Sequence, residues 1–306
     1  MRISTNQIQL SMLDNLQHGF GEYARLDRQI SSNKRILQPS DDPVGSVRLL
    51  GLKKEQVAME QYQKNIANAK SQLSQGEIQL ESMTNMLMRL RELTQTAANG
   101  SLSEDDRRAV ATEAAIIKDG LFDLANARNE SGSSLFTGSK VDQPALVKVT
   151  DPADPDFGSY KYQGDSLVRE VSIANGVTVG LNQTADKLFI DNGDFFKQLD
   201  SMVAAMERSG APDAADQARG MLDRSKVLQD DISQMVSTIG ARMNLLDQVD
   251  EGHAEKGVYS KEVSNQIESL DYASAVTQQA HVLMALQVQQ QAFAKVNGLS
   301  LFNYMP

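Results

Sequence analysis

The sequence predicts a mainly α-helical protein: an elongated, antiparallel coiled-coil bundle of long helices to which both ends of the chain contribute. A small β-rich domain is expected as an insert at mid-chain. Three observations predict this class: an apolar heptad repeat over residues 52–97, amphipathic patterns at both ends, and alternating or β-branched residues between 139 and 194. Aromatic residues make up only 5% of the chain and Trp is absent, which suits a thin helical core.

The longest predicted helix runs over Val44–Ala98. Positions spaced by seven from Leu52 and from Glu55 form two series, and eleven of these fourteen positions are apolar. At about 1.5 Å per residue, this helix would be roughly 80 Å long. Its apolar seam needs partner helices. Residues 103–128 and 213–249 carry matching stripes, so we expect the seam to be core within one subunit.

Residues 3–37 are predicted to form an amphipathic helix, because apolar side chains recur along one helix face. A corner follows in the sequence Gln38-Pro39-Ser40-Asp41-Asp42-Pro43. Pro39 ends the first helix, whereas Pro43 fits the first turn of the next one because it lacks an N–H. Ser40 or Asp41 is expected to cap the new helix. The helix-corner motif is therefore predicted at Ser40, Asp41, Asp42 and Pro43.

The stretch 139–194 is predicted to be the β-rich insert. Tyr160-Lys161-Tyr162 alternates, and the β-branched residues Val168, Val171 and Ile173 recur over residues 168–173. Ala174-Asn175-Gly176 is typical of a hairpin turn and leads into a further short strand over 177–179. Since the helices run out and back around it, we place the insert at the far tip of the bundle.

Helical patterns return over 195–206 and 213–249, and a last amphipathic stretch begins near Val263. This pattern divides the chain into three parts. Residues 1–40 and 255–306 are predicted terminal assembly helices, residues 41–138 and 195–254 a helical rod, and residues 139–194 the insert.

The composition and motifs argue against an enzyme or a nucleic-acid-binding protein. The net charge is −10, whereas a nucleic-acid partner favours a basic face. Cysteine is absent, and the three histidines have no metal-binding spacing. Asp151, Asp154 and Asp156 lack the glycine and distal glutamate of a calcium loop, so we interpret them as an acidic loop. We expect no catalytic residue, metal or cofactor.

The sequence also bears on membranes and export. It has no apolar run long enough to cross a bilayer. Residues 1–7 lack the apolar region of a signal peptide, so general secretion is not expected and a specialised route stays open.

Both ends of the chain resemble the bacterial flagellin superfamily. The Ser40–Pro43 corner before a long heptad helix is similar to its N-terminal signature, and Val263–Tyr304 to its C-terminal helix. Within the superfamily, the opening Met1-Arg2-Ile3-Ser4-Thr5 resembles the hook-associated protein 3 branch. Three further segments are similar to that branch: Leu135-Phe136-Thr137-Gly138, Tyr162-Gln163-Gly164-Asp165 and Leu299-Ser300-Leu301-Phe302.

This resemblance implies a structural protein of the flagellum. It would join the hook to the filament, as a ring of about eleven subunits between the first hook-associated junction protein and flagellin, and would template flagellin assembly. The resemblance also implies export through the flagellar type III apparatus and a cytoplasmic chaperone on the C-terminal segment. The terminal helices would form an inner tube and the insert would point outward.

We predict that the two terminal segments carry subunit association. An amphipathic helix without an intramolecular partner leaves its stripe exposed, so residues 3–37 and 263–302 are expected to be poorly ordered in the monomer and to order on assembly. The predicted contacts are Leu13, Leu16, Phe20, Ile267, Leu270, Leu283 and Leu286.

Two alternatives stay open. Flagellin itself, the filament subunit, has similar ends, whereas the opening residues and the small insert favour the junction branch. A cytosolic coiled-coil interaction module would account for the heptads and the acidity. It would not account for the corner, the insert and the amphipathic ends together.

Overall fold

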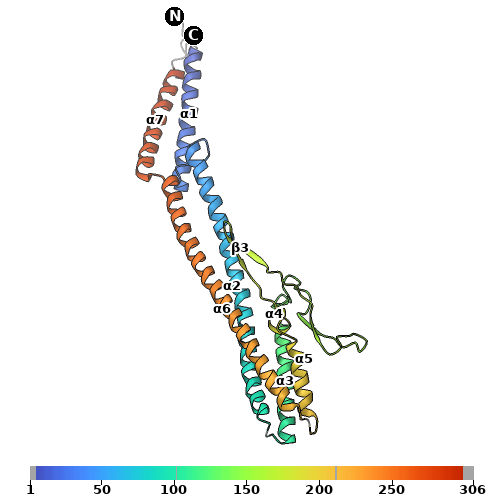
Figure 1. Cartoon of the computed structure of the whole chain (residues 1–306). Helices are drawn as coiled ribbons and strands as arrows, with labels where there is room; N and C mark the ends of the chain where they lie inside the picture. Colours follow the sequence, from blue (N-terminus) through green and yellow to red (C-terminus); the bar gives the residue numbers. More distant parts are fainter. Residues whose placement is uncertain (1–4, 101, 211, 299–306) are drawn as a thin grey trace. The chain divides into compact units, whose positions relative to one another are not determined.

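The computed structural model describes residues 5–100, 102–210 and 212–298, and the predicted mainly helical fold with a β-containing segment at mid-chain is confirmed (Figure 1). The chain divides into two compact units. The terminal unit comprises Met1–Ala58 and Ala254–Pro306, and the central unit comprises Met59–His253. Helices α2 (Pro43–Ala98) and α6 (Ala214–Glu268) contribute residues to both units.

The terminal unit pairs the two ends of the chain. Helix α1 (Thr5–Ser32) lies beside α7 (Tyr272–Gly298), as Figure 1 shows. The expectation that the first helix continues to residue 37 is wrong. Asn33 has φ of 53°, a left-handed conformation that a right-handed helix cannot continue, and Lys34 then forms a β-bridge with Ser269.

Helix α6 is longer than its apolar stripe suggested. The expected end near Val249 and the expected new helix near Val263 are both wrong, because α6 continues to Glu268. No proline interrupts residues 249–268, and the glycines there cost only about 1 kcal/mol each relative to alanine. The break comes instead before Asp271, whose Oδ1 accepts a hydrogen bond from the Ser274 N–H (3.2 Å) at the start of α7.

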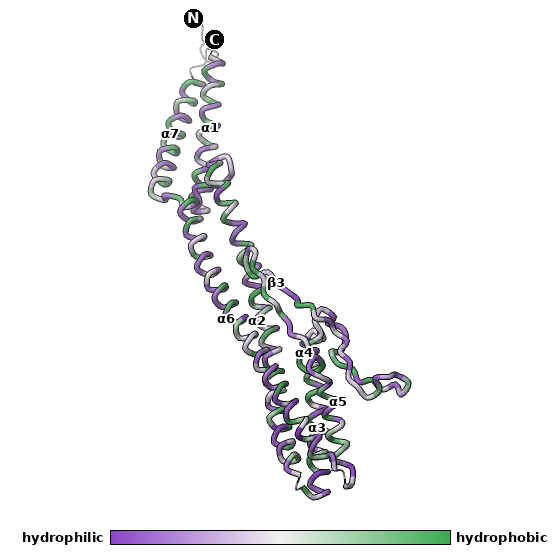
Figure 2. Tube along the Cα trace, viewed as in Figure 1, coloured by the Kyte–Doolittle hydropathy of each residue, from purple (hydrophilic) through white to green (hydrophobic). Residues whose placement is uncertain are grey.

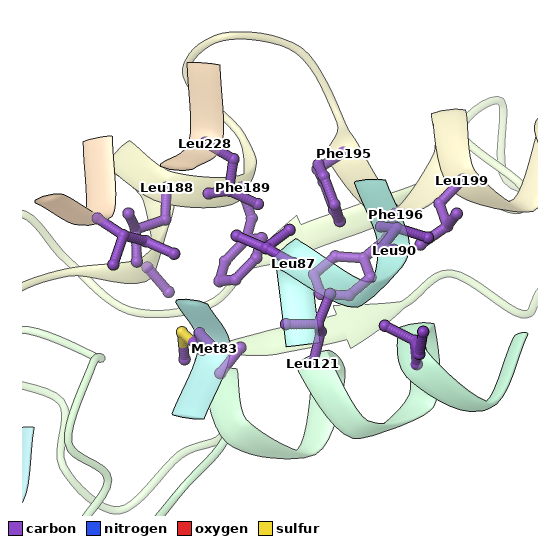
Figure 3. Close-up of a cluster of buried hydrophobic side chains, with 14 of the residues drawn as sticks. Met83, Leu87, Leu90, Leu121, Leu188, Phe189, Phe195, Phe196, Leu199 and Leu228 are labelled. Atoms are coloured by element: carbon purple, nitrogen blue, oxygen red, sulfur yellow. The ribbon is translucent and has the colours of Figure 1, made fainter. Parts of the chain in front are cut away.

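The central unit has one hydrophobic core, to which the heptad residues of α2 contribute. Ile66, Leu73, Leu80, Met83, Leu87 and Leu90 are all at most 2% exposed, so the prediction that this seam is core within the subunit is confirmed. Figure 2 shows the corresponding alternation of hydrophobic and hydrophilic residues along α2. Figure 3 shows part of this core, in which Leu87, Leu121 and Leu228 lie near Phe189 and Phe196.

Two further helices of this unit begin at side-chain caps. Ser103 precedes α3 (Glu104–Ala125) and its hydroxyl accepts a hydrogen bond from the Asp106 N–H (3.2 Å). Asp194 caps α5 (Phe195–Glu207) in the same way through Lys197 N–H (2.9 Å). Its second carboxylate oxygen accepts from the Tyr160 N–H (2.8 Å), which ties the start of α5 to the insert.

The insert contains two short antiparallel hairpins and one short helix. Strand β1 (Leu146–Lys148) pairs with β2 (Tyr160–Tyr162), β3 (Glu170–Ala174) pairs with β4 (Val177–Gly180), and α4 (Ala185–Phe189) follows. The predicted β2 strand and the turn before β4 are confirmed, and Gly176 adopts φ of 74° in that turn. Strand β1 and helix α4 were not predicted. The expected place of the insert at the far tip is wrong, because the Ser172 and Ile173 carbonyls of β3 lie 2.8 Å from Asn65 Nδ2 and 2.7 Å from His253 Nε2, far from the ends of α2 and α6 at Ala98 and Ala214.

The insert shares its core with the helices. Leu146, Tyr160, Ile173, Val179 and Phe189 are at most 6% exposed and belong to the same hydrophobic cluster as α2, α3, α5 and α6. The Phe196 ring lies 5.1 Å from that of Tyr160 and 4.9 Å from that of Phe189, measured between centroids. Two-stranded hairpins are barely stable alone, so packing on the helices stabilises them.

Candidate assembly surface and helix corner

Helices α1 and α7 bury one stripe against each other. Leu16 and Leu26 on α1 and Ala275 and Leu286 on α7 are all at most 8% exposed. Gly19 leaves room for Leu286, because a Cβ added at residue 19 would lie 2.7 Å from the Leu286 Cδ2 atom. The premise that the terminal helices have no intramolecular partner is therefore wrong. Sequence periodicity marks an apolar stripe but does not say which helix covers it.

A second stripe on the same pair stays exposed. On α1, Leu10, Leu13 and Phe20 are 67%, 45% and 51% exposed, and on α7, Leu283 and Met284 are 44% and 63% exposed. Since 13 and 20 are seven residues apart, they lie on one face beside the buried seam. The terminal unit thus presents apolar surface that nothing within its described residues covers.

A network of charged residues joins α1, α2 and α6 where the chain turns. The Arg35 guanidinium donates hydrogen bonds to Asp42 Oδ2 (3.0 Å) and to the Ile267 carbonyl (3.0 Å) near the end of α6. Lys34 Nζ lies 2.7 Å from Glu268 Oε2. Arg35 therefore fixes the start of α2 against the end of α6, where a cation also interacts favourably with the helix dipole.

The corner motif itself has two acidic residues with different roles. Asp42 Oδ1 accepts from the Gly45 N–H (2.8 Å), so Asp42 is the N-cap of α2 and Pro43 is the first helical residue. Asp41 Oδ2 accepts from the N–H groups of Leu37 (2.9 Å) and Gln38 (3.0 Å) and closes the preceding turn. The expectation that Ser40 or Asp41 caps the helix is wrong, because proline at the first helical position makes the residue before it the cap.

Hydrogen bonds lower the pKa of both carboxyl groups. The Gln38 and Leu37 N–H groups hold the pKa of Asp41 below its usual range. For Asp42, the Gly45 N–H and then the Arg35 guanidinium have the same effect on the pKa. Both side chains are therefore charged at neutral pH, which the cap and the ion pair require.

Residues 3–141 match the family model described as the bacterial flagellin N-terminal helical region. Over 99% of both chains, the sequence is 26% identical to flagellar hook-associated protein 3 of Escherichia coli strain K12. A solved chain from Vibrio parahaemolyticus, assigned to the flagellar hook-associated proteins, is 35% identical; the match covers 75% of this chain and 100% of that one, with a TM-score of 0.69. This chain belongs to the flagellar hook-associated protein 3 family.

The Listeria flagellins, which match over nearly the full length, do so at lower identity than the hook-associated protein 3. The flagellin of Listeria innocua is 21% identical over 97% of the chain. The family assignment agrees with the predicted resemblance to the junction branch rather than to the filament subunit.

The predicted assembly residues of this hook-associated protein 3 family member divide into two groups. Leu16 and Leu286 are buried between α1 and α7, whereas Leu13, Phe20 and Leu283 are exposed on that pair. Ile267 and Leu270 are half-buried where α6 ends and α7 has not yet begun. The segments Met1–Ser4 and Leu299–Phe302, which carried part of the resemblance, lie outside the described residues.

Sequence reasoning missed three members of the corner network: Lys34, Arg35 and Glu268. Arg35 and Glu268 are more than 200 residues apart, yet the Arg35 N–H donates to the Glu268 carbonyl (2.7 Å). Two cations directly before the Pro39–Pro43 corner were the only local signal. Their partner could not be identified because the end of α6 was placed too early.

Among residues 5–100, 102–210 and 212–298, no group of three or more His, Cys, Asp or Glu is placed to hold a metal ion. In the acidic loop, Lys161 Nζ lies 3.5 Å from Asp154 and 2.9 Å from Asp156. Within the same residues, each helix is too short or too polar to cross a bilayer.

We expect Asp42→Ala to destabilise the terminal unit, because the substitution removes both the α2 cap and the partner of Arg35. Far-ultraviolet circular dichroism of the full chain should show an earlier loss of helix on heating. Ser40→Ala is the matched control, since the Ser40 side chain is exposed. Equal melting curves for Asp42→Ala and wild type would contradict the role of Asp42 as the cap.

We expect acid pH to reduce the stability that Asp42 contributes at the same corner. The folded-state pKa of Asp42 is lowered, so the stability it contributes is complete above the unfolded pKa of about 3.9 and is lost as pH falls through the lower folded pKa. Asp42→Asn should therefore reduce the dependence of unfolding on pH below about 4. Urea unfolding of the full chain between neutral and acid pH measures this. The same acid dependence in both proteins would refute the assignment.

Proposed function

We propose that this chain is the junction protein that connects the flagellar hook to the filament and templates flagellin assembly. The observation that carries the proposal is 26% identity over 99% of both chains to a hook-associated protein 3, whereas the flagellin of Listeria innocua is 21% identical over 97% of this chain. The small insert and the opening residues support it as well, because flagellin has similar terminal helices. The protein acts by assembly and has no catalytic role.

Its partners follow from its place in the flagellum. One neighbour is the first hook-associated junction protein, another is flagellin, and the protein associates with itself in a ring of about eleven subunits. It reaches this extracellular position through the flagellar export route without a cleaved signal peptide. A cytoplasmic chaperone covers the C-terminal segment before export. This part of the proposal is supported by the exposed apolar residues of α7, which include Leu283, Met284 and Val288.

The three parts of the chain have separate tasks in this proposal. Residues 1–40 and 255–306 form the inner tube, residues 41–138 and 195–254 surround it, and residues 139–194 point outward. Leu13, Phe20 and Leu283 are exposed and contact neighbouring subunits directly. Leu16 and Leu286 act through the α1–α7 pair, while Ile267 and Leu270 act where α6 ends.

We also propose that the terminal helices become more ordered on assembly. The α1–α7 pair covers only one stripe of each helix, so the pair should open more easily than the central unit and become protected once neighbours bury the second stripe. Hydrogen exchange on the free monomer measures this. Protection of α1 and α7 equal to that of the α2 heptads at low concentration would contradict it.

A deletion strain tests the function. Cells without this chain should keep intact hooks and release unpolymerised flagellin into the medium, and a plasmid copy should restore filaments. Normal filaments in the deletion strain would overturn the proposal. Release of flagellin also separates the proposal from a cytosolic coiled-coil module, whose loss should leave the hook–filament junction unaffected.

Antibody labelling separates the junction protein from a filament subunit. The stretch 160–190 contains the exposed residues Leu167, Val168 and Val177, so an antibody raised against it can reach its epitope. A single band at the distal tip of the hook is expected, with an anti-flagellin antibody as the control. Label along the whole filament would identify the chain as flagellin.

A further inference from the structure

The first turns of α2 carry apolar residues on two opposite faces. Leu49 and Leu52 are half-buried on the inner face, which also carries Gln56. Val47, Leu50 and Val57 are 72%, 56% and 59% exposed. At 100° per residue, these three side chains lie about 110–190° around the helix from the inner face. We call Val47, Leu50, Lys54 and Val57 the α2 outer face.

The end of α6 has an exposed face of a different character. Ser260 is 2% exposed and marks its inner face, whereas Val258 and Tyr259 are 72% and 68% exposed. Glu255 and Glu262 lie within one turn of Val258 on the same side and are exposed. We call Glu255, Val258, Tyr259 and Glu262 the α6 outer face.

These two faces cannot meet within one chain. The Gln56 side chain donates a hydrogen bond to Ser260 Oγ (3.3 Å), so α2 and α6 contact each other through their inner faces at this height. The outer faces therefore point away from each other, at the same level along the two helices. Exposed apolar side chains grouped at one level indicate a surface that a partner covers.

The charges of the two faces are complementary. Lys54 lies among the apolar residues of the α2 outer face, with Lys53 and Glu55 exposed beside it. On the α6 outer face, Glu255 and Glu262 lie on either side of Val258, and Lys256 and Lys261 are exposed at its edges. Like faces would bring like charges together, whereas an α2 face against an α6 face pairs opposite charges. The complementary partner of each face is thus present on every copy of this chain.

We propose that the α2 outer face of one subunit docks on the α6 outer face of the next. This inference rests on the proposed function, because it names the contact through which the subunits of the junction associate. An interface between two different faces is heterologous, so each subunit keeps one face free for another copy, and such contacts form a ring when the rotation between subunits closes. Each face extends over only about 10–15 Å of helix, so this contact supplements the terminal-helix surface rather than replacing it.

Disulfide cross-linking in assembled flagella tests the contact. The chain has no native cysteine, so every disulfide that this protein forms must come from the introduced cysteines. The double variants Val57→Cys with Val258→Cys and Leu50→Cys with Val258→Cys are expressed in the deletion strain, and isolated flagella are oxidised. A ladder of dimers, trimers and higher species is expected on a non-reducing gel, because the contact repeats around the ring.

The single-cysteine variants decide the geometry. A heterologous contact brings residue 57 to residue 258 and not to its own copy, so each single variant should remain monomeric. Dimers from a single variant would indicate like faces in contact and would overturn the proposal. Absence of the ladder from both double variants in flagella of normal length would also overturn it, while leaving the junction function standing.

Reversing the charges of the two faces provides a second test, again measured by the cross-linked fraction. Lys54→Glu in the Val57/Val258 double-cysteine background should lower the cross-linked fraction about two- to fivefold, and adding Glu262→Lys should restore it. Lys64→Glu is the matched control, since it makes the same charge change at an exposed position of α2 in the central unit. An equal loss with Lys64→Glu, or no restoration by Glu262→Lys, would contradict charge pairing between the faces.

Discussion

Replacing Phe196 with alanine is expected to lower the free energy of unfolding of the central unit by about 3–5 kcal/mol. The Phe196 side chain is fully buried, and its ring lies within 5.7 Å, between centroids, of the rings of Phe122, Tyr160, Phe189 and Phe195. The loss combines the transfer free energy of the ring with the cost of a cavity where the insert meets α3 and α5.

Denaturant unfolding of the full chain measures this loss. Phe157→Ala is the matched control, because Phe157 is 55% exposed in the loop between β1 and β2 and its removal should change stability by less than about 0.5 kcal/mol. Hydrogen exchange tests whether the insert is a separate domain, because Phe196→Ala would then leave the protection of the Ile173 and Val179 amides unchanged. We expect these two amides to lose protection together with those of α5.

Leu286→Asp is expected to abolish function by separating α1 from α7. Leu286 is 3% exposed and lies against Gly19, so the substitution places a carboxylate in a buried position between the two helices. The expected cost is about 3–5 kcal/mol, which is more than a pair of surface helices can lose. The variant should lose helical circular dichroism from the terminal unit and should fail to restore motility in the deletion strain.

Two control variants test whether the loss of function comes from the buried charge at residue 286. Gln278→Asp introduces the same charge at an exposed position of α7 and should leave both readouts unchanged. Leu283→Asp should leave the helical signal unchanged, because Leu283 is 44% exposed, but should still reduce motility if it contacts a neighbour. Full motility with Leu286→Asp would show that the α1–α7 pair is not needed in the assembled flagellum.

Heptad periodicity made the central helices predictable. A 3–4 repeat in α2 and matching stripes in α3 and α6 require mutual burial whatever the rest of the chain does, and Leu80, Leu90 and Leu121 are fully buried as a result. Strand β2 and the turn at Gly176 were predictable for a similar reason, since each depends on a few adjacent residues.

Positions that depend on distant residues were predicted less well. Strand β1 consists of Leu146-Val147-Lys148, which is too short to show a pattern, and it exists because β2 pairs with it. The end of α6 was misplaced because helix propensity continues through residue 268, and the stop depends on Asp271 and on the bridge between Ser269 and Lys34.

Local periodicity and proline chemistry were enough to predict four features: the helical class, the α2 seam, the mid-chain insert and the corner between Pro39 and Pro43. Which apolar surfaces remain exposed could be seen only in the folded chain. Leu13 and Leu16 belong to the same amphipathic helix, yet one is 45% exposed and the other is 8% exposed. The difference arises because α7 covers one side of α1, and hydrophobic burial depends on which neighbour is present rather than on the residue alone.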